Sequence, residues 1–144
     1  MAELESEYPY RSGITGRWST CKYDEKSKTA VDVSSYTLVK GSHPTQMKAA
    51  LEQQPLAVSV HAGRLHFMNY ESGVLDAPGC GTGLDHAVLA VGYGTDEKSG
   101  LDYWLIKNSW ADDWGENGYI RMAIVDGDGI CGIQISPLYP TTNQ

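Results

Sequence analysis

The sequence predicts an α+β fold, in which an antiparallel, β-barrel-like sheet carries a few short peripheral helices. The composition suits strands and tight turns, with 16 Gly, 9 Tyr and 4 Trp against a single Phe. Helical periodicity is convincing in only one short segment, whereas the second half of the chain contains several runs of strand length. A sheet with few helices accounts for both observations.

The chain length of 144 residues predicts one domain over residues 1–144. A compact chain of this size buries roughly 68–70% of its unfolded surface, which is enough for a hydrophobic core. Hydrophobic residues make up 41% of the sequence and charged residues 20%, proportions that argue against disorder.

The first half of the chain predicts one clear helix, over residues 44–54. Pro44 suits the first turn of a helix, and Pro55 stops one. The apolar positions that follow helical spacing between these prolines are Met47, Ala50 and Leu51.

Shorter elements are predicted on either side of that helix. Residues 1–40 are polar and rich in turn residues. The apolar segment 56–60 predicts a strand, and residues 63–70 predict a second short helix with Leu65 and Met68 on one face.

The second half of the chain predicts a succession of strands. Residues 86–93 are nearly all apolar, residues 103–108 are aromatic and aliphatic, and residues 118–124 alternate between two faces. The polar stretch 95–102 separates the first two of these runs, which is the signal of a hairpin loop.

The predicted hairpin brings His86, at the start of one strand, beside Asn108, at the end of the next. An amide oxygen next to one imidazole nitrogen fixes the tautomer and leaves the other nitrogen available for proton transfer. Trp110 and Trp114 follow closely and would shield this hydrogen bond from water. The alternative is that His86 is a core histidine with its hydrogen bonds satisfied; the asparagine and the two tryptophans favour the catalytic interpretation.

Three separate motifs follow one another along the chain: Asp85-His86-Ala87, Lys107-Asn108-Ser109-Trp110 and the stretch from Trp114 to Tyr119. In these motifs and their order the sequence resembles the papain-like cysteine peptidases. The resemblance runs from Glu5 to Pro140 and so covers nearly the whole chain. It implies that the chain is the C-terminal, barrel-type domain of such a peptidase.

The resemblance also implies roles for individual residues. His86 would be the catalytic base and acid, and Asn108 would orient it. Trp110 would cover their contact, with Trp114 and Asp85 in support.

The nucleophile of the family has no counterpart in the sequence. Its Cys-Gly-Ser/Ala-Cys-Trp/Tyr signature precedes the histidine by about 130–150 residues, whereas 85 residues precede His86 and the signature is absent from them. We therefore expect half of a cysteine endopeptidase, cut near the domain boundary with Met1 as an added start, and inactive alone. The alternative is a non-catalytic module that binds peptides or inhibitors.

The chain contains an odd number of cysteines, namely three. The resemblance implies a disulfide between Cys80 and Cys131, and it places the partner of Cys21 in the missing N-terminal domain. Cys21 is then an unpaired cysteine in this chain, and all three cysteines have structural roles.

The resemblance implies a substrate-binding surface as well. Positions on this domain's wall of the pocket for the second residue before the scissile bond are Ser59, Leu84, Ala87 and Ser136. Mostly small side chains there would leave room for a bulky apolar group. The alternative is that these are ordinary strand residues.

Two other features of the sequence bear on the backbone rather than on the chemistry. Ala111 stands where the family usually has Gly, which would strain the backbone if that position needs a positive φ. Residues 126–129, Asp-Gly-Asp-Gly, resemble part of a calcium loop but lack its later ligands, so they predict a turn.

No metal and no cofactor are expected. His43, His61 and His66 lack zinc spacing with the cysteines and are expected at the surface or partly buried.

The expected partners are the missing N-terminal peptidase domain and either peptide substrates or cysteine-peptidase inhibitors. Self-association through the exposed interdomain face is also expected. The formal net charge of −7 disfavours nucleic acid, and no apolar run is long enough for a membrane helix. The family and the disulfide predict a lysosome, a vacuole or the extracellular space.

Overall fold

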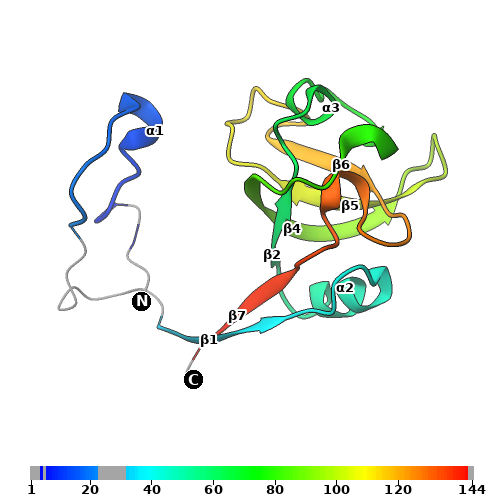
Figure 1. Ribbon diagram of the computed structural model, residues 1–144, viewed down its shortest axis with the longest axis horizontal. Coiled ribbons are helices and arrows are strands. Elements are labelled where there is room, and N and C mark those ends of the chain that lie inside the picture. The colour runs from blue at the N-terminus through cyan, green and yellow to red at the C-terminus, as the bar shows by residue number, and fades with distance from the viewer. Residues whose placement is uncertain (1–3, 5, 23–31, 143–144) are drawn as a thin grey trace. The chain divides into compact units, whose positions relative to one another are not determined.

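The computed structural model describes residues 4, 6–22 and 32–142. Met1 and Glu5, where the sequence analysis placed an added start and the beginning of the resemblance, lie outside the described residues. The chain divides into two compact units, residues 1–36 with 140–144 and residues 37–139. Figure 1 shows the elements of both units.

The described residues form short helices and seven strands. The helices are α1 (Ser12–Thr15), α2 (Pro44–Leu51) and α3 (Leu65–Met68), with the 3₁₀ turns η1 (Pro78–Cys80) and η2 (Ile130–Gly132). The strands are β1 (Val33–Leu38), β2 (Leu56–Val60), β3 (Val74–Leu75), β4 (His86–Thr95), β5 (Asp102–Lys107), β6 (Tyr119–Ala123) and β7 (Leu138–Thr142).

The strands form one sheet in the order β1-β7-β2-β4-β5-β6-β3. The predicted mixed α+β fold is therefore confirmed. Its sheet is not closed into a barrel, because β1 and β3 stand at opposite ends of this order. The central ladders β2–β4, β4–β5 and β5–β6 are antiparallel, whereas the edge strand β3 runs parallel to β6.

The elements predicted from the strongest sequence patterns are present in the structure. The predicted helix 44–54 is α2, which ends at Leu51, and the predicted strand 56–60 is β2. The predicted hairpin is β4–β5, closed by the turn of residues 96–101.

The segments with weak sequence patterns were predicted less accurately. The second helix is confined to Leu65–Met68, and its buried residue is Phe67, whereas Leu65 is 72% exposed and Met68 49% exposed. The strands β1, β3 and β7 were not predicted. β3 has only two residues, β1 is exposed along its whole length, and β7 lacks a buried residue, so none of the three carries a period-two apolar pattern.

The core lies on one face of the central strands. In β2 the alternate residues Leu56, Val58 and Val60 are buried, and the pattern continues across β4 to β6. Trp104 is fully buried, and its indole N–H donates to Gln134 Oε1 over 3.0 Å. The buried Gln134 amide in turn donates to the carbonyls of Val125 and Gly127, so its polar atoms are satisfied.

Helix α2 is tied to the far end of the β4–β5 hairpin. Lys48 Nζ lies 3.2 Å from Asp102 Oδ2 and 5.2 Å from the ring centre of Tyr93. The hydroxyl of Tyr93 also donates to the carboxylate of Glu52. These contacts fix the hairpin at the end remote from His86 and Asn108.

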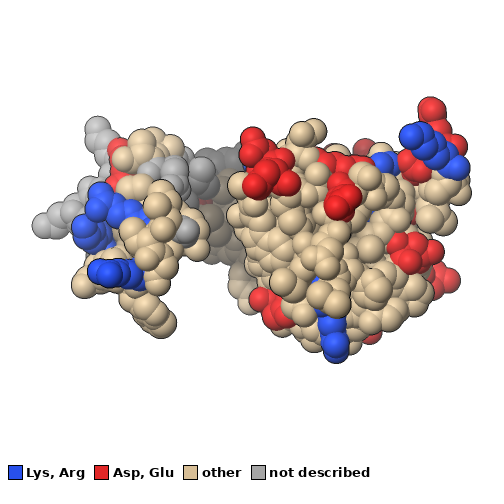
Figure 2. Space-filling model, turned by 90° about the horizontal axis from the view of Figure 1, so that it is seen from above, with Lys and Arg blue, Asp and Glu red and all other residues tan. Residues whose placement is uncertain are grey.

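Acidic side chains lie at several separate places on the face of the larger unit seen in Figure 2, among only a few basic ones. This distribution agrees with the formal net charge of −7. Within the described ranges, no helix is long and apolar enough to cross a bilayer.

Candidate active site

The β4–β5 ladder brings His86 and Asn108 together. The register pairs Leu89 of β4 with Lys107 of β5, so the first residue of one strand lies near the residue after the other. His86 Nε2 and Asn108 Oδ1 are 2.8 Å apart. Both side chains are largely withdrawn from solvent, with Asn108 8% exposed and His86 partly buried.

A second hydrogen bond defines the protonation of this pair. The backbone N–H of Ser109 donates to Asn108 Oδ1 over 2.8 Å, which identifies that atom as the amide oxygen. His86 Nε2 faces an acceptor and therefore carries the proton of the neutral ring. The lone pair is then on Nδ1, the nitrogen that does not contact Asn108.

An aromatic cluster surrounds the imidazole. Trp110 stacks on His86 with ring centres 5.0 Å apart and planes inclined by 28°. Phe67 meets both rings edge-on, with its centre 5.5 Å from that of Trp110 and 6.2 Å from that of His86. Trp114 packs against Phe67 and Trp110 at 5.2 and 5.4 Å, and its indole N–H donates to Met68 O. The imidazole of His86 is thus in contact with two aromatic rings, those of Trp110 and Phe67.

Sequence reasoning did not find Phe67. This residue is fully buried and is the only phenylalanine of the chain. It falls inside the predicted second helix, for which only Leu65 and Met68 were named, as residues on one face. The one available signal was its size, because a single large aromatic in a short helix is more readily buried than Leu or Met at its edge.

Asp85 lies beside this site but acts on the backbone. Its two carboxylate oxygens accept the N–H groups of Ala62 at 2.7 Å and Gly63 at 3.1 Å. The hydrogen bond from Ala62 is the main cause that lowers the pKa of this carboxyl below its ordinary value. Asp85 thus holds the segment after β2 against the segment before β4.

The residues expected to contact substrate lie on the outer face of the sheet or next to it. Ser59 of β2 is directly opposite Ala87 of β4 in the ladder, and neither is in the buried row of its strand. Leu84 packs near Gly132, where an added Cβ would lie 2.8 Å from its Cδ2. Ser136 is partly buried four residues further along the chain. Of these four residues, Ala87 lines a surface groove, together with Val88, Leu89, Lys107, Asn108 and Ser109.

The disulfide between Cys80 and Cys131 is present, as expected. Its Cα atoms are 4.9 Å apart, and it joins residues separated by 51 positions. The bridge links η1 to η2 and so fixes the loop that leads to His86. Cys21 is exposed and outside this disulfide; its Sγ accepts a hydrogen bond from the hydroxyl of Tyr8 over 3.8 Å.

An ion-pair network that sequence reasoning missed secures the loop carrying the tryptophans. Arg121 of β6 makes two hydrogen bonds to the Glu116 carboxylate, at 2.8 and 2.7 Å, and one to Asp96 at 2.5 Å. Glu116 also accepts the N–H of Gly73. The hydrogen bonds from Arg121 lower the pKa of Glu116, and Ser99 together with Arg121 lowers the pKa of Asp96 to about 2. No periodic pattern could signal a contact between these dispersed charges.

Two further expectations concern the backbone. Ala111 has φ = 69°, so the residue that replaces the usual Gly occupies the left-handed region. Residues 126–129 form a turn, in which Asp128 Oδ1 accepts the hydroxyl of Ser42 over 2.6 Å. In the part of the chain that the structure describes, no cluster of His, Cys, Asp or Glu is arranged to hold a metal ion.

Comparison with known proteins relates this chain to a protein family. The profile described as papain family cysteine protease matches residues 2–141. The cysteine proteinase RD21A of Arabidopsis thaliana is 43% identical over 143 residues, which are 98% of this chain and 29% of that protein. The cysteine proteinase COT44 of Brassica napus is 41% identical over 138 residues, which are 94% of this chain and 40% of that protein.

Solved structures agree. The bromelain protease from Ananas comosus in complex with the inhibitor E64 superposes with a TM-score of 0.86 at 41% identity, covering 98% of this chain and 63% of that one. The chain therefore spans less than two thirds of the length of each of these relatives.

Proposed function

The chain belongs to the papain family of cysteine proteases, and we propose that residues 1–144 are the C-terminal domain of a cysteine endopeptidase that supplies the catalytic His86 and its orienting Asn108. The observation that carries this proposal is the 2.8 Å contact from His86 Nε2 to Asn108 Oδ1, under the stacked ring of Trp110. A docking surface for peptides needs no such pair, whereas proton transfer by a fixed imidazole does.

In this mechanism His86 Nδ1 takes the proton of a cysteine thiol that another domain presents. The products of that transfer are a thiolate and an imidazolium, and the thiolate attacks the peptide carbonyl. The imidazolium then returns its proton to the leaving amine, and a water completes hydrolysis of the acyl-enzyme. Asn108 Oδ1 accepts the Nε2–H throughout and thereby keeps Nδ1 directed at the sulfur.

We propose that these 144 residues are inactive alone. The signature of the nucleophilic cysteine is absent from their sequence. Cys80 and Cys131 are joined in a disulfide, so neither sulfur is a thiolate. Cys21, whose Sγ accepts the Tyr8 hydroxyl, also stands outside any such signature. Activity then requires the N-terminal domain as a partner.

The substrates in this proposal are peptides with a bulky apolar side chain at the second position before the scissile bond. Ser59 and Ala87, which face each other on the outer side of β2 and β4, contribute small side chains to that wall. Leu84 and Ser136 flank them. Inhibitors of cysteine peptidases that occupy the same cleft would contact the same residues.

The disulfide supports an oxidising compartment for this domain, such as a vacuole, a lysosome or the extracellular space. Self-association of the isolated domain remains an expectation, tested by light scattering over a concentration series.

The test is a fusion of this chain to the N-terminal domain of a relative such as RD21A. The fusion is expected to hydrolyse a fluorogenic peptide, whereas the chain alone is not. His86→Ala should abolish hydrolysis by the fusion, and the exposed His66→Ala should retain it. A folded fusion without activity, or an active His86→Ala fusion, would contradict the catalytic proposal and favour a non-catalytic binding module.

A further inference from the structure

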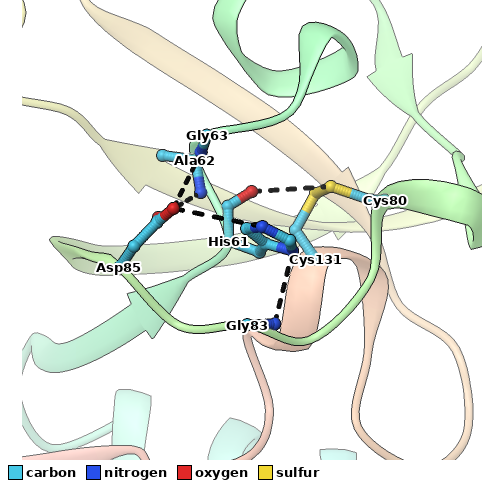
Figure 3. The surroundings of a disulfide bond; sticks show 7 residues. All are labelled: His61, Ala62, Gly63, Cys80, Gly83, Asp85 and Cys131. Atoms are coloured by element: carbon cyan, nitrogen blue, oxygen red, sulfur yellow. Dashed lines mark hydrogen bonds and ion pairs between the residues drawn. A yellow bond between two sulfur atoms is a disulfide. The ribbon is translucent and has the colours of Figure 1, made fainter.

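His61, which the proposed reaction does not use, lies at the junction of three segments next to the site (Figure 3). It follows the last residue of β2, and its side chain is only 16% exposed. Its backbone N–H donates to Cys131 O over 2.8 Å, beside the disulfide. Its ring lies against the glycines that precede His86: an added Cβ would be 3.0 Å from the ring at Gly81 and 3.4 Å at Gly83.

The two nitrogens of this ring face groups of opposite character. The backbone N–H of Gly83 donates to Nδ1 over 3.3 Å, and Nε2 is 4.0 Å from Asp85 Oδ2. An amide N–H can only donate, so Nδ1 carries the lone pair and the neutral ring holds its proton on Nε2, toward the carboxylate. A second proton must therefore go to Nδ1, where it removes the acceptor of Gly83.

Protonation also changes the attraction to Asp85. A charged ring at 4.0 Å attracts the carboxylate, which already accepts Ala62 N–H and Gly63 N–H. Asp85 is further held by its own N–H, which donates to Val60 O over 3.1 Å. The neutral ring thus holds the segment 83–85 through the Gly83 hydrogen bond, whereas the charged ring attracts Asp85 and releases Gly83.

The segment 83–85 leads directly into the site. Leu84 is the middle residue of this segment, and His86 is the first residue of β4. We propose that His61 is a positioning residue that holds Gly83 and Leu84 in place when its ring is neutral and releases them when the ring takes up a second proton. The consequence for substrate, a change in the pocket wall at Leu84, rests on the function proposed above.

Among the described residues, few ionisable groups lie near the His61 ring. The segment 83–85 contributes Asp85, and β4 contributes His86, whose charge acts on the same carboxylate. The turns η1 and η2 contribute the Cys80–Cys131 disulfide, which does not titrate, and no ionisable side chain. A change at the Gly83 amide reports on the charge of His61 rather than of His86, because the Gly83 N–H donates to the His61 ring.

The experiment uses nuclear magnetic resonance on the ¹⁵N-labelled 144-residue chain, with no need for peptide hydrolysis. Ring ¹⁵N shifts are expected to show the Nε2–H tautomer of His61 when neutral. The Gly83 amide shift is followed over a series from about pH 5 to 8 and is expected to change when the ring takes up its second proton. Its protection against hydrogen exchange, corrected for intrinsic rate, should be about tenfold lower with the charged ring than with the neutral ring, as expected for one lost hydrogen bond.

Two variants and a control complete the test. His61→Phe keeps a ring without an acceptor, and His61→Gln offers an oxygen that does not titrate in this range; both are expected to abolish the Gly83 titration. His66→Phe, an exposed histidine on α3, is expected to leave it unchanged. A Nδ1–H tautomer, a flat Gly83 profile in the parent chain, or a titration that survives in a folded His61→Gln chain would overturn the inference. A Gly83 titration with an inactive fusion would support the role of His61 while contradicting the proposed protease function.

Discussion

The indole of Trp110 lies on the imidazole of His86, with ring centres 5.0 Å apart and planes inclined by 28°. The same imidazole meets Asn108 Oδ1 at its edge, over 2.8 Å. One face and one nitrogen of the ring are therefore fixed by groups that follow β5, while the ring itself begins β4. These two contacts restrict the rotation of the His86 ring, as the proposed role in proton transfer requires.

Replacement of Asn108 should affect the orientation of His86 more than the fold. Asn108→Ala removes the acceptor of Nε2–H, so we expect a mixture of His86 tautomers by ¹⁵N NMR. In the fused two-domain protein, the loss of one hydrogen bond worth about 1.4–2.8 kcal/mol should lower kcat/KM by about 10- to 100-fold. The exposed Gln53→Ala is the control, and equal kcat/KM for both variants would contradict the orienting role.

Phe67 should be among the most costly core residues to truncate. It is fully buried and contacts His86, Trp110 and Trp114. Phe67→Ala is expected to lower the free energy of unfolding by about 3–5 kcal/mol, measured by urea denaturation. Leu65→Ala on the same helix, where the side chain is 72% exposed, should change it by less than about 0.5 kcal/mol. Similar losses of unfolding free energy in the two variants would contradict the assignment of Phe67 to the core and of Leu65 to the surface of α3.

Reduction of the Cys80–Cys131 bridge should destabilise the larger unit. The bridge joins residues 51 positions apart, and the chain-entropy estimate for such a loop is about 4 kcal/mol. The Cys80→Ser/Cys131→Ser double variant should lose about that much stability in denaturant. Cys21→Ser serves as the control, because Cys21 lies outside the bridge and in the other unit. An unchanged midpoint in the double variant would show that the bridge is dispensable.

Ala111→Gly should stabilise the protein. Ala111 has φ = 69°, a region that costs an L-residue with a Cβ roughly 1–2 kcal/mol and costs Gly little. Because Gly also adds freedom to the unfolded chain, we expect a net gain of about 0.5–1 kcal/mol. Ala49→Gly, at an exposed position inside α2, should lose about 0.5–1 kcal/mol instead. Thermal melts of the two variants that shift in the same direction would exclude this explanation.

The ion pair between Asp96 and Arg121 should make the stability of the protein fall at low pH. Hydrogen bonds from Ser99 and Arg121 lower the pKa of Asp96 from its ordinary 3.8 to about 2. A carboxyl with a lowered pKa stabilises the fold above the unfolded value, and that contribution disappears as the pH falls through the folded value.

Asp96→Asn should therefore be less stable than the parent near pH 7, and the difference in unfolding free energy between the two proteins should narrow as the pH falls from about 4 toward 2. Urea denaturation at these pH values measures this difference. Gln53→Ala, at an exposed position with no ionisable side chain, is the control and should leave the pH dependence of the parent unchanged. A gap for Asp96→Asn that stays constant down to about pH 2 would refute the linkage.

The elements with strong local patterns followed from the sequence. The prolines around α2, the apolar run of β2 and the polar loop between β4 and β5 each reflect interactions within a few residues. The proximity of His86 and Asn108 also followed, because a hairpin places the start of its first strand beside the end of its second. Sequence motifs then connected the pair to a family.

Only the tertiary structure decided the rest. The burial of Phe67, the contact of Gly83 with His61 and the pairing of Arg121 with Glu116 and Asp96 join side chains whose meeting depends on loop paths. The positive φ of Ala111 likewise depends on how its loop closes over the sheet. Local periodicity reflects which face of an element is apolar, whereas packing and ion pairing depend on where separate elements come to lie, and that is fixed only when the chain has folded.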